Sequence, residues 1–479
     1  MIPQWYNDAK FGIFIHWGLF SVPGWAYSEK GKSIAQIHKE HNPFAGQKYN
    51  PYAEWYWNSL RIDGSPTQAY HEKVYGKNFA YEDFQAQFED ISSSFDASEW
   101  ADLFKKAGAG YAVMVTKHHD GYCLWPSRYK NPRRPGYGSK RDYVGELTEA
   151  VRAKGMKMGL YYSGIFDWTF KQKAMDDPES WLDHYLADDE YAAYSLNQTK
   201  ELISRYHPSI LWNDMGYPAQ CSLEALFSEY RSAVPDGVIN DRWIQRSLPE
   251  GKTVAGYAKE LTEQKKIMNI SDGIHGDFYT PEYQKITELP DKKWESTRGI
   301  GMSFGYNRNE ERENFLTGKA LVHMLCDIVS KNGNLLLNVG PMADGTIEDA
   351  QRDTLLAAGE WLKVNGEAIY GTAYGDLRKI GCEVTEAEKA APDRKAVTET
   401  VTAGGKKVCF TRKNSTSYAM VLDDECCGEV EISGVRLPSD MKASLLQDGR
   451  PVVWENTDNG VRFILPERMP EAAYVIKIK

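Results

Sequence analysis

The chain has 479 residues, more than one ordinary domain needs, which predicts two or three domains. Hydrophobic residues make up 42% of it, enough for a large core, and no apolar run reaches the roughly 18 residues that a membrane-spanning helix requires. The net charge is −10 and the basic residues are scattered, so we expect neither a nucleic acid nor a membrane as partner.

Short apolar runs rich in β-forming residues alternate with helical patterns over roughly the first 340 residues. Asp96 and Glu99 form a capping-box pattern that predicts the start of a helix, and further helices are expected over residues 144–154 and within residues 183–205. The expected strands are residues 11–17, 111–116, 157–162, 210–214, 238–243, 299–304 and 335–339. Such alternation is typical of an α/β fold with a parallel sheet. Because no GxGxxG turn is present, a closed or nearly closed (β/α)8-like barrel is favoured over a nucleotide-binding sheet.

The pattern changes after about residue 375. Residues 407–479 alternate apolar and polar side chains with a period of two, which predicts antiparallel strands. The charged, alanine-rich residues 386–396 are expected to form a loop beside the boundary. We therefore divide the chain into a (β/α)8-like catalytic domain over residues 1–375 and a C-terminal antiparallel β-sandwich over residues 376–479.

Cysteine usage and the amino terminus bear on the compartment. The seven cysteines are odd in number and widely scattered, which does not fit a disulfide framework. The polar start of the chain shows no signal peptide, although a leader removed earlier would leave no trace. A reducing, cytoplasmic location is the expectation.

Polar side chains follow several of the expected strands. His16 ends the first strand, His118 and His119 follow the second, and Tyr161 lies near the end of the third. The carboxyl ends of strands form the functional face of a barrel enzyme, so these side chains are candidates for a site. Adjacent histidines in a strand point to opposite faces, so at most one of the pair faces the interior unless the backbone turns there.

Two carboxylates suit glycoside hydrolysis. Asp214 ends an apolar strand, and Glu282 lies in a polar, aromatic stretch that is expected to form a loop. A strand-borne and a loop-borne carboxylate can supply a nucleophile and an acid. An aromatic content of 13% also fits sugar binding, because an apolar ring with a polar tip matches a sugar face. Two alternatives stay open: Asp214 caps the following helix, or a different glutamate (Glu54, Glu288 or Glu295) has the second role.

Other chemistries find less support. His118, His119 and Asp120 suggest a metal-dependent hydrolase, but the chain supplies no HxxxH or CxxC partner for them. Neutral imidazoles that bond sugar hydroxyls explain the histidines better. No GxSxG or P-loop pattern occurs. We therefore expect no metal and no cofactor.

Taken together, the motifs resemble the α-L-fucosidases of glycoside hydrolase family 29. The resemblance covers essentially the whole chain in order, including the β-sandwich. The motifs that carry it are residues 10–18 (KFGIFIHWG), 54–58 (EWYWN), 116–121 (TKHHDG), 124–127 (LWPS), 159–162 (GLYY), 211–216 (LWNDMG), 240–243 (NDRW), 294–301 (WESTRGIG) and 334–341 (NLLLNVGP).

The resemblance implies a retaining, exo-acting hydrolase of fucosylated oligosaccharides or glycoconjugates. Asp214 matches the nucleophile and Glu282 resembles the general acid/base, and in retaining enzymes two such carboxyl groups lie about 5–5.5 Å apart. The resemblance also implies that Phe14 and Phe304 contact the C5 methyl of fucose. The other pocket residues that it implies are His16, Glu54, Trp55, His118, His119, Tyr161, Trp212 and Arg242.

Residues 244–276 are the one departure from the family pattern, since this largely polar stretch is longer than in close relatives. It can reshape the side of the site that receives the leaving group, or alter contacts in a homo-oligomer. A competing hypothesis is a fucose-binding protein without catalysis, against which the presence of both Asp214 and Glu282 argues. The sequence does not specify the linkage cleaved, or whether transfer to sugars competes with water.

Overall fold

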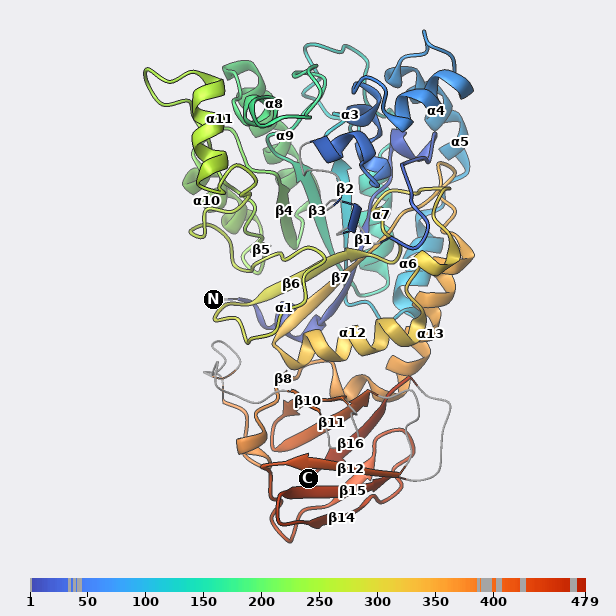
Figure 1. Cartoon of the computed structure of the whole chain (residues 1–479), viewed down its shortest axis with the longest axis vertical. Coiled ribbons are helices and arrows are strands. Elements are labelled where there is room, and N and C mark those ends of the chain that lie inside the picture. Colours follow the sequence, from blue (N-terminus) through green and yellow to red (C-terminus); the bar gives the residue numbers. More distant parts are fainter. Residues whose placement is uncertain are drawn as a thin grey trace.

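The structure is a computed structural model that describes residues 2–32, 36–37, 40, 45–385, 388, 399–401, 407–422, 428–465 and 472–479. Figure 1 shows a curled sheet surrounded by helices and, below it in this view, a smaller body made of strands. The expected loop at residues 386–396 lies outside the described residues, apart from Glu388. No helix of the described part is both long and apolar enough to span a membrane.

Seven parallel strands form the first sheet in the order β5-β4-β3-β2-β1-β7-β6. Every residue of β1, β2 and β7 is buried, which explains why these strands appear in the sequence as continuous apolar runs. The strands are β1 (Phe11–Ile15), β2 (Tyr111–Lys117), β3 (Lys157–Ser163), β4 (Ile210–Asp214), β5 (Val238–Ile239), β6 (Trp294–Gly299) and β7 (Gly333–Val339).

Helices surround this sheet, as the alternating pattern predicts (Figure 1). Asp96 is the N-cap of α6, and its side chain accepts a hydrogen bond from the backbone N–H of Ser98. In the expected capping box, that side chain would instead accept from the backbone N–H of Glu99. The helices are α1 (Gln4–Ala9), α3 (Tyr56–Leu60), α4 (Pro66–Val74), α5 (Phe84–Ile91), α6 (Ala97–Lys106), α7 (Tyr143–Ala153), α8 (Pro178–Tyr185), α9 (Asp189–Tyr206), α10 (Leu223–Ala233), α11 (Val254–Glu263), α12 (Gly318–Ser330) and α13 (Asp349–Asn365).

A short segment links the two ends of the sheet. The backbone N–H of Asp277 donates to the carbonyl of Ile239, the last residue of β5, at 2.7 Å, and that of Tyr279 donates to the carbonyl of Lys293, just before β6, at 3.0 Å. Isolated parallel bridges join Phe278 to Asn240, and Glu282 to Thr297 of β6. Residues 277–283 therefore bridge β5 and β6 and make the barrel nearly closed, and they place Glu282 at its rim.

Two of the strand predictions were wrong in detail. The strand expected at residues 299–304 lies instead at residues 294–299, as β6. It was missed because its side chains are polar and give no apolar run. Glu295, for example, lies inside the barrel and accepts hydrogen bonds from two tyrosine hydroxyls. The strand expected over residues 238–243 stops at Ile239. Beyond that point the side chain of Asn240 takes the place of the backbone hydrogen bonds between β5 and β4. It accepts from the backbone N–H of Asn213 at 2.9 Å and donates to the carbonyl of the same residue at 2.8 Å.

The C-terminal part contains two antiparallel sheets. One has the order β13-β16-β11-β10-β8, with β9 paired to β10, and the other has the order β12-β15-β14. Their shared core includes Phe410, Val430, Phe463 and Ile476, all buried. The strands are β8 (Ala373–Tyr374), β9 (Glu399–Val401), β10 (Lys407–Lys413), β11 (Thr416–Leu422), β12 (Gly428–Ser433), β13 (Ala443–Leu445), β14 (Val453–Asn456), β15 (Gly460–Leu465) and β16 (Tyr474–Ile478). This arrangement is a β-sandwich.

Candidate active site

A cavity of about 1000 Å³ opens at the carboxyl ends of the barrel strands. All twelve residues proposed for the site line it, although they come from eight separate stretches of the chain. They are Phe14, His16, Glu54, Trp55, His118, His119, Tyr161, Trp212, Asp214, Arg242, Glu282 and Phe304.

Asp214 is the last residue of β4 and is only 8% exposed. Its Oδ2 accepts from the Tyr161 hydroxyl at 2.8 Å, and its Oδ1 accepts from Arg242 Nη1 at 2.9 Å. Burial by itself raises the pKa of Asp214, but the charge of Arg242 and the donated hydrogen bonds outweigh it and hold that pKa below its usual value. The next helix is capped by Ser222, so Asp214 is not a helix cap. It is a carboxylate kept ionised inside a cavity.

Glu282 has a different environment from Asp214. Its side chain is 32% exposed, and it accepts from Arg242 Nη2 at 3.1 Å and from the Tyr52 hydroxyl at 3.4 Å. The guanidinium of Arg242 is in turn fixed by Thr280, through Oγ1 at 3.0 Å and the carbonyl oxygen at 3.2 Å. One arginine thus connects a buried carboxylate with one that solvent can reach.

Three histidines contribute neutral imidazoles to the cavity. Burial is the main cause that lowers the pKa of His16 to about 4, that of His119 to about 3 and that of His118 well below its usual value. Both adjacent histidines line the cavity, because β2 ends at Lys117 after a bulge that begins at Val115. The backbone therefore turns after Lys117, which is the condition under which both histidines could face the interior.

Aromatic rings form an apolar wall beside the carboxylates. The rings of Phe14 and Phe304 meet edge to face with centroids 6.5 Å apart, and Phe14 lies 5.1 Å from Trp212. Tyr161 stacks on Trp212 with centroids 5.5 Å apart. Such a wall suits an apolar group on a ligand and leaves a polar group there without a partner.

The competing glutamates occupy other positions. Glu295 is fully buried beneath the cavity, where it accepts from Trp212 Nε1 at 3.2 Å and does not line the cavity itself. Glu288 does not line the cavity either. Glu54 does, but its carboxylate oxygen Oε2 is occupied by the backbone N–H of Gly305 at 2.8 Å, and burial raises its pKa to about 8. Glu54 is therefore a neutral acid at pH 7, held in the wall.

Comparison with known proteins agrees with this geometry. The family model described as α-L-fucosidase matches residues 1–367. The chain belongs to the α-L-fucosidase family. It is 36% identical over 391 residues to an α-L-fucosidase of Dictyostelium discoideum, covering 78% of this chain and 72% of that relative.

Solved structures of this family share the whole architecture. The chain is similar to a crystal structure of Thermotoga maritima α-fucosidase in complex with a mechanism-based inhibitor, with 39% identity and a TM-score of 0.80. It is also similar to a structure of that enzyme in complex with fucose, with 38% identity and a TM-score of 0.79. Each comparison covers 100% of this chain and 97% of the other. The barrel followed by a β-sandwich is thus the architecture of an α-L-fucosidase.

Sequence reasoning missed several residues that support the family's site. Tyr52 reaches Glu282 and Thr280 reaches Arg242, both from loops, and Asn338 Oδ1 accepts a hydrogen bond from His16 Nδ1 at 2.6 Å. Of these three residues, only Asn338 lies near the carboxyl end of a strand, β7, and its position there could have marked it as a candidate. Met268 and Ile270, from the long stretch over residues 244–276, line the outer cavity.

Asp120, the acidic residue next to His118 and His119 in the sequence, does not line the cavity with them. Asp120 faces away from the cavity, accepting from the Tyr81 hydroxyl at 2.8 Å and from the backbone of Tyr122 at 3.1 Å. Within the described residues, no group of three or more histidine, cysteine, aspartate or glutamate side chains is placed to hold a metal ion. His118 and His119 line the cavity, where they can meet a ligand.

Proposed function

We propose that the protein is a retaining, exo-acting α-L-fucosidase that hydrolyses terminal α-L-fucosyl linkages of oligosaccharides or glycoconjugates. The observation that carries this proposal is the pair of unlike carboxylates joined by Arg242. Asp214 is buried and ionised, whereas Glu282 is partly exposed at the same cavity. Two carboxylates with different environments suit the two roles of a double displacement.

The reaction would proceed in two steps. In the first, an Asp214 oxygen bonds to the anomeric carbon of fucose while the bond to the leaving oxygen breaks and Glu282 gives that oxygen its proton. In the second, Glu282 takes a proton from water, the water oxygen bonds to the anomeric carbon, and the bond to Asp214 breaks. Arg242 would stabilise the negative charge of Asp214 before the first step and after the second, and that of Glu282 once it has given up its proton.

The shape of the cavity supports action on a terminal sugar. Phe14, His16 and Trp212 lie deep within it, each at most 5% exposed, so a chain end fits there better than the middle of a polymer. The outer part, lined by Met268 and Ile270 among others, would receive the leaving group. A sugar bound there instead of water would give transfer rather than hydrolysis.

The same proposal covers partners and compartment. The expected partner is a fucosylated glycan, with no cofactor required. The cysteines in the described part of the chain are free thiols, which supports a reducing, cytoplasmic location.

Proton NMR of an aryl α-L-fucoside during turnover tests the function. The first product should be α-fucose, which later mutarotates, and the matching aryl α-L-galactoside should react far more slowly because its hydroxymethyl group meets the apolar wall. If β-fucose appears first, the double displacement is wrong. If purified, folded protein binds fucose without turnover, a binding protein is the correct description.

A further inference from the structure

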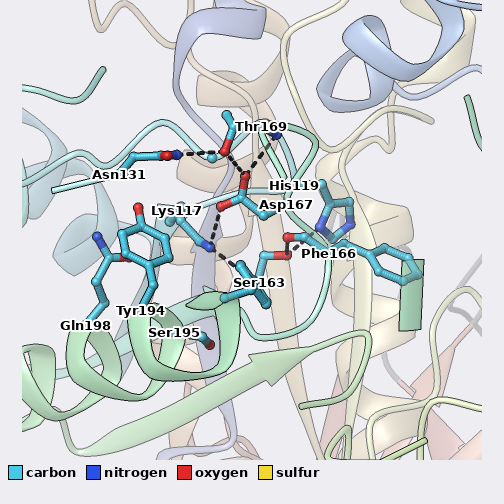
Figure 2. Close-up of polar contacts among 12 residues, drawn as sticks. Lys117, His119, Asn131, Ser163, Phe166, Asp167, Thr169, Tyr194, Ser195 and Gln198 are labelled. Carbon is cyan, nitrogen blue, oxygen red and sulfur yellow. Dashed lines mark hydrogen bonds and ion pairs between the residues drawn. The ribbon is translucent and has the colours of Figure 1, made fainter. Parts of the chain in front are cut away.

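A buried ion pair lies directly behind the histidines of the cavity. Lys117 Nζ is 2.9 Å from Asp167 Oδ2, and both side chains are completely inaccessible to solvent. Figure 2 shows this pair in the same cluster as His119 and Ser163. Neither charge lines the cavity.

The surroundings of Lys117 keep it charged. Burial lowers its pKa, but the interaction with Asp167, followed by those with Tyr162 and Tyr191, outweighs that effect, so its pKa stands well above its usual value. The lysine nitrogen lies 4.5 Å from the ring centroid of Tyr162, 5.3 Å from that of Tyr191 and 5.5 Å from that of Tyr194. Burying a charged pair costs nearly as much as it returns, so stability alone does not account for this pair.

Asp167 fixes the loop that follows β3. Its Oδ1 accepts from the backbone N–H of Thr169 at 3.0 Å and from the Thr169 hydroxyl at 2.5 Å, and Asn131 Nδ2 donates to that hydroxyl oxygen at 2.6 Å (Figure 2). Gly121 has a positive φ of 75°, and a Cβ there would lie 2.6 Å from Asp167 Oδ1. The motif after Lys117 is thus shaped to accept this carboxylate.

The fixed loop surrounds His119. The backbone N–H of Trp168 donates to the carbonyl of His119 at 2.8 Å, and the rings of Phe166 and Trp168 lie 5.4 Å and 5.6 Å from the imidazole. His119 Nδ1 lies 2.7 Å from the hydroxyl oxygen of Ser163, which donates its own proton to the carbonyl of Phe166 at 2.7 Å. Ser163 can therefore only accept from the imidazole.

We propose that Ser163 and the Lys117–Asp167 pair form a positioning unit that holds His119 as the Nδ1–H tautomer, so that Nε2 presents a lone pair to the cavity and accepts a hydrogen bond from a hydroxyl of the bound sugar. The last step rests on the proposed function, whereas the tautomer does not. Lys117, Ser163 and Asp167 are positioning residues that act through His119.

The tautomer matters because of what Nε2 faces. It lies 3.9 Å from Asp214 Oδ2. A proton on Nε2 would point toward this carboxylate and draw electron density away from the proposed nucleophile. With the proton on Nδ1, Tyr161 remains the donor to Oδ2, and the imidazole is free to receive a sugar hydroxyl.

Nitrogen NMR of the ligand-free protein, labelled with ¹⁵N-histidine, tests the tautomer without any activity. The His119 signals, assigned by their loss in His119→Asn, should show a protonated Nδ1 and a bare Nε2. Ser163→Ala should shift the population toward Nε2–H. Ser195→Ala is the matched control, because Ser195 donates to the carbonyl of Gly164 in the same loop at 3.0 Å, and it should leave the signals unchanged. A wild-type Nε2–H, or an unchanged tautomer in Ser163→Ala, overturns the proposal.

The ion pair is tested in the same way. Lys117→Met with Asp167→Leu removes both charges, and Thr169→Val loosens Asp167 while leaving the pair in place should the double variant fail to fold. Each folded variant should show both His119 tautomers. On an aryl α-L-fucoside, kcat/KM should fall roughly tenfold in Ser163→Ala and stay unchanged in Ser195→Ala. A single Nδ1–H tautomer in the double variant would show that the pair is merely structural, and one in Thr169→Val would show that the contact of Asp167 with the loop does not position His119. Absence of fucoside turnover in the wild type would count against the function and leave the NMR result standing.

Discussion

Arg242 Nη1 lies 2.9 Å from Asp214 Oδ1, and the second terminal nitrogen of the same guanidinium reaches Glu282 at 3.1 Å. The planar fork of arginine can serve two carboxylates at once, whereas the single ammonium of lysine cannot do so with the same geometry. The arginine therefore contacts both proposed catalytic groups and lowers the pKa of Asp214, so replacing it should affect the function of both.

Arg242→Lys should lower kcat/KM for an aryl α-L-fucoside by about 100-fold or more, the scale of a lost donor to transition-state charge. Because Arg242 lowers the pKa of Asp214, the acidic limb of the pH–rate profile should also move to higher pH. Arg231→Lys is the control, because Arg231 pairs with Asp277, which lies on the segment 277–283 that also carries Glu282. A normal rate with an unmoved acidic limb would contradict this assignment.

Asp214→Gly should abolish turnover of unactivated fucosides while the fold and the affinity for fucose are largely retained, because no other nucleophile stands at the anomeric carbon. Azide should partly restore cleavage of an aryl fucoside, entering the vacated space and giving a fucosyl azide of inverted configuration. The measurement is aryl release with and without azide, together with NMR of the product. Near-normal turnover without azide would place the nucleophile elsewhere.

Glu282→Ala should depend on the leaving group, because an acid is needed only for a poor one. Turnover of natural oligosaccharides should fall severely, whereas an activated nitrophenyl fucoside should give a burst followed by slow turnover as the fucosyl-enzyme accumulates. The basic limb of the pH–rate profile should vanish. Glu54→Ala and Glu295→Ala should slow both substrates alike, and the leaving-group pattern in either would transfer the acid/base role to it.

The buried histidines should make the fold sensitive to acid. The pKa of His119 falls from 6.5 to about 3 on folding, so below pH 6.5 the unfolded chain binds a proton that the folded chain does not. Stability is therefore lost as pH falls from 6.5 toward 3. In urea unfolding of the ligand-free protein, His119→Asn should lessen this loss by up to about 1.4 kcal/mol per pH unit. Parallel wild-type and variant curves would contradict the expectation.

Exhaustive chelation should leave activity unchanged, because His118 and His119 are assigned as hydrogen-bond partners of ring hydroxyls. Initial rates on an aryl α-L-fucoside before and after dialysis against a chelator check this. Loss of activity that zinc restores would favour the metal-dependent alternative instead.

Several elements could be predicted from local patterns of residues alone. The apolar run before Asp214 appears as β4 with the expected bounds, and the neighbouring runs at residues 111–116 and 157–162 each became strands one residue longer. A strand buried on both faces must be apolar throughout, so its position can be recognised from a few consecutive residues. The side chains at the ends of such strands were found for the same reason.

The contacts that cross the barrel could not be predicted from such patterns, because they join elements that are distant in the sequence. Strand β6 is polar because Glu295 bonds Tyr6, Tyr111 and Trp212 from distant elements, so no local pattern could reveal it. The bridge that brings Glu282 to β6 depends likewise on closure of the barrel. The pairing of Lys117 with Asp167 spans 50 residues. Such interactions depend on which distant segments meet in the folded chain, and the spacing of residues in the sequence does not reveal this.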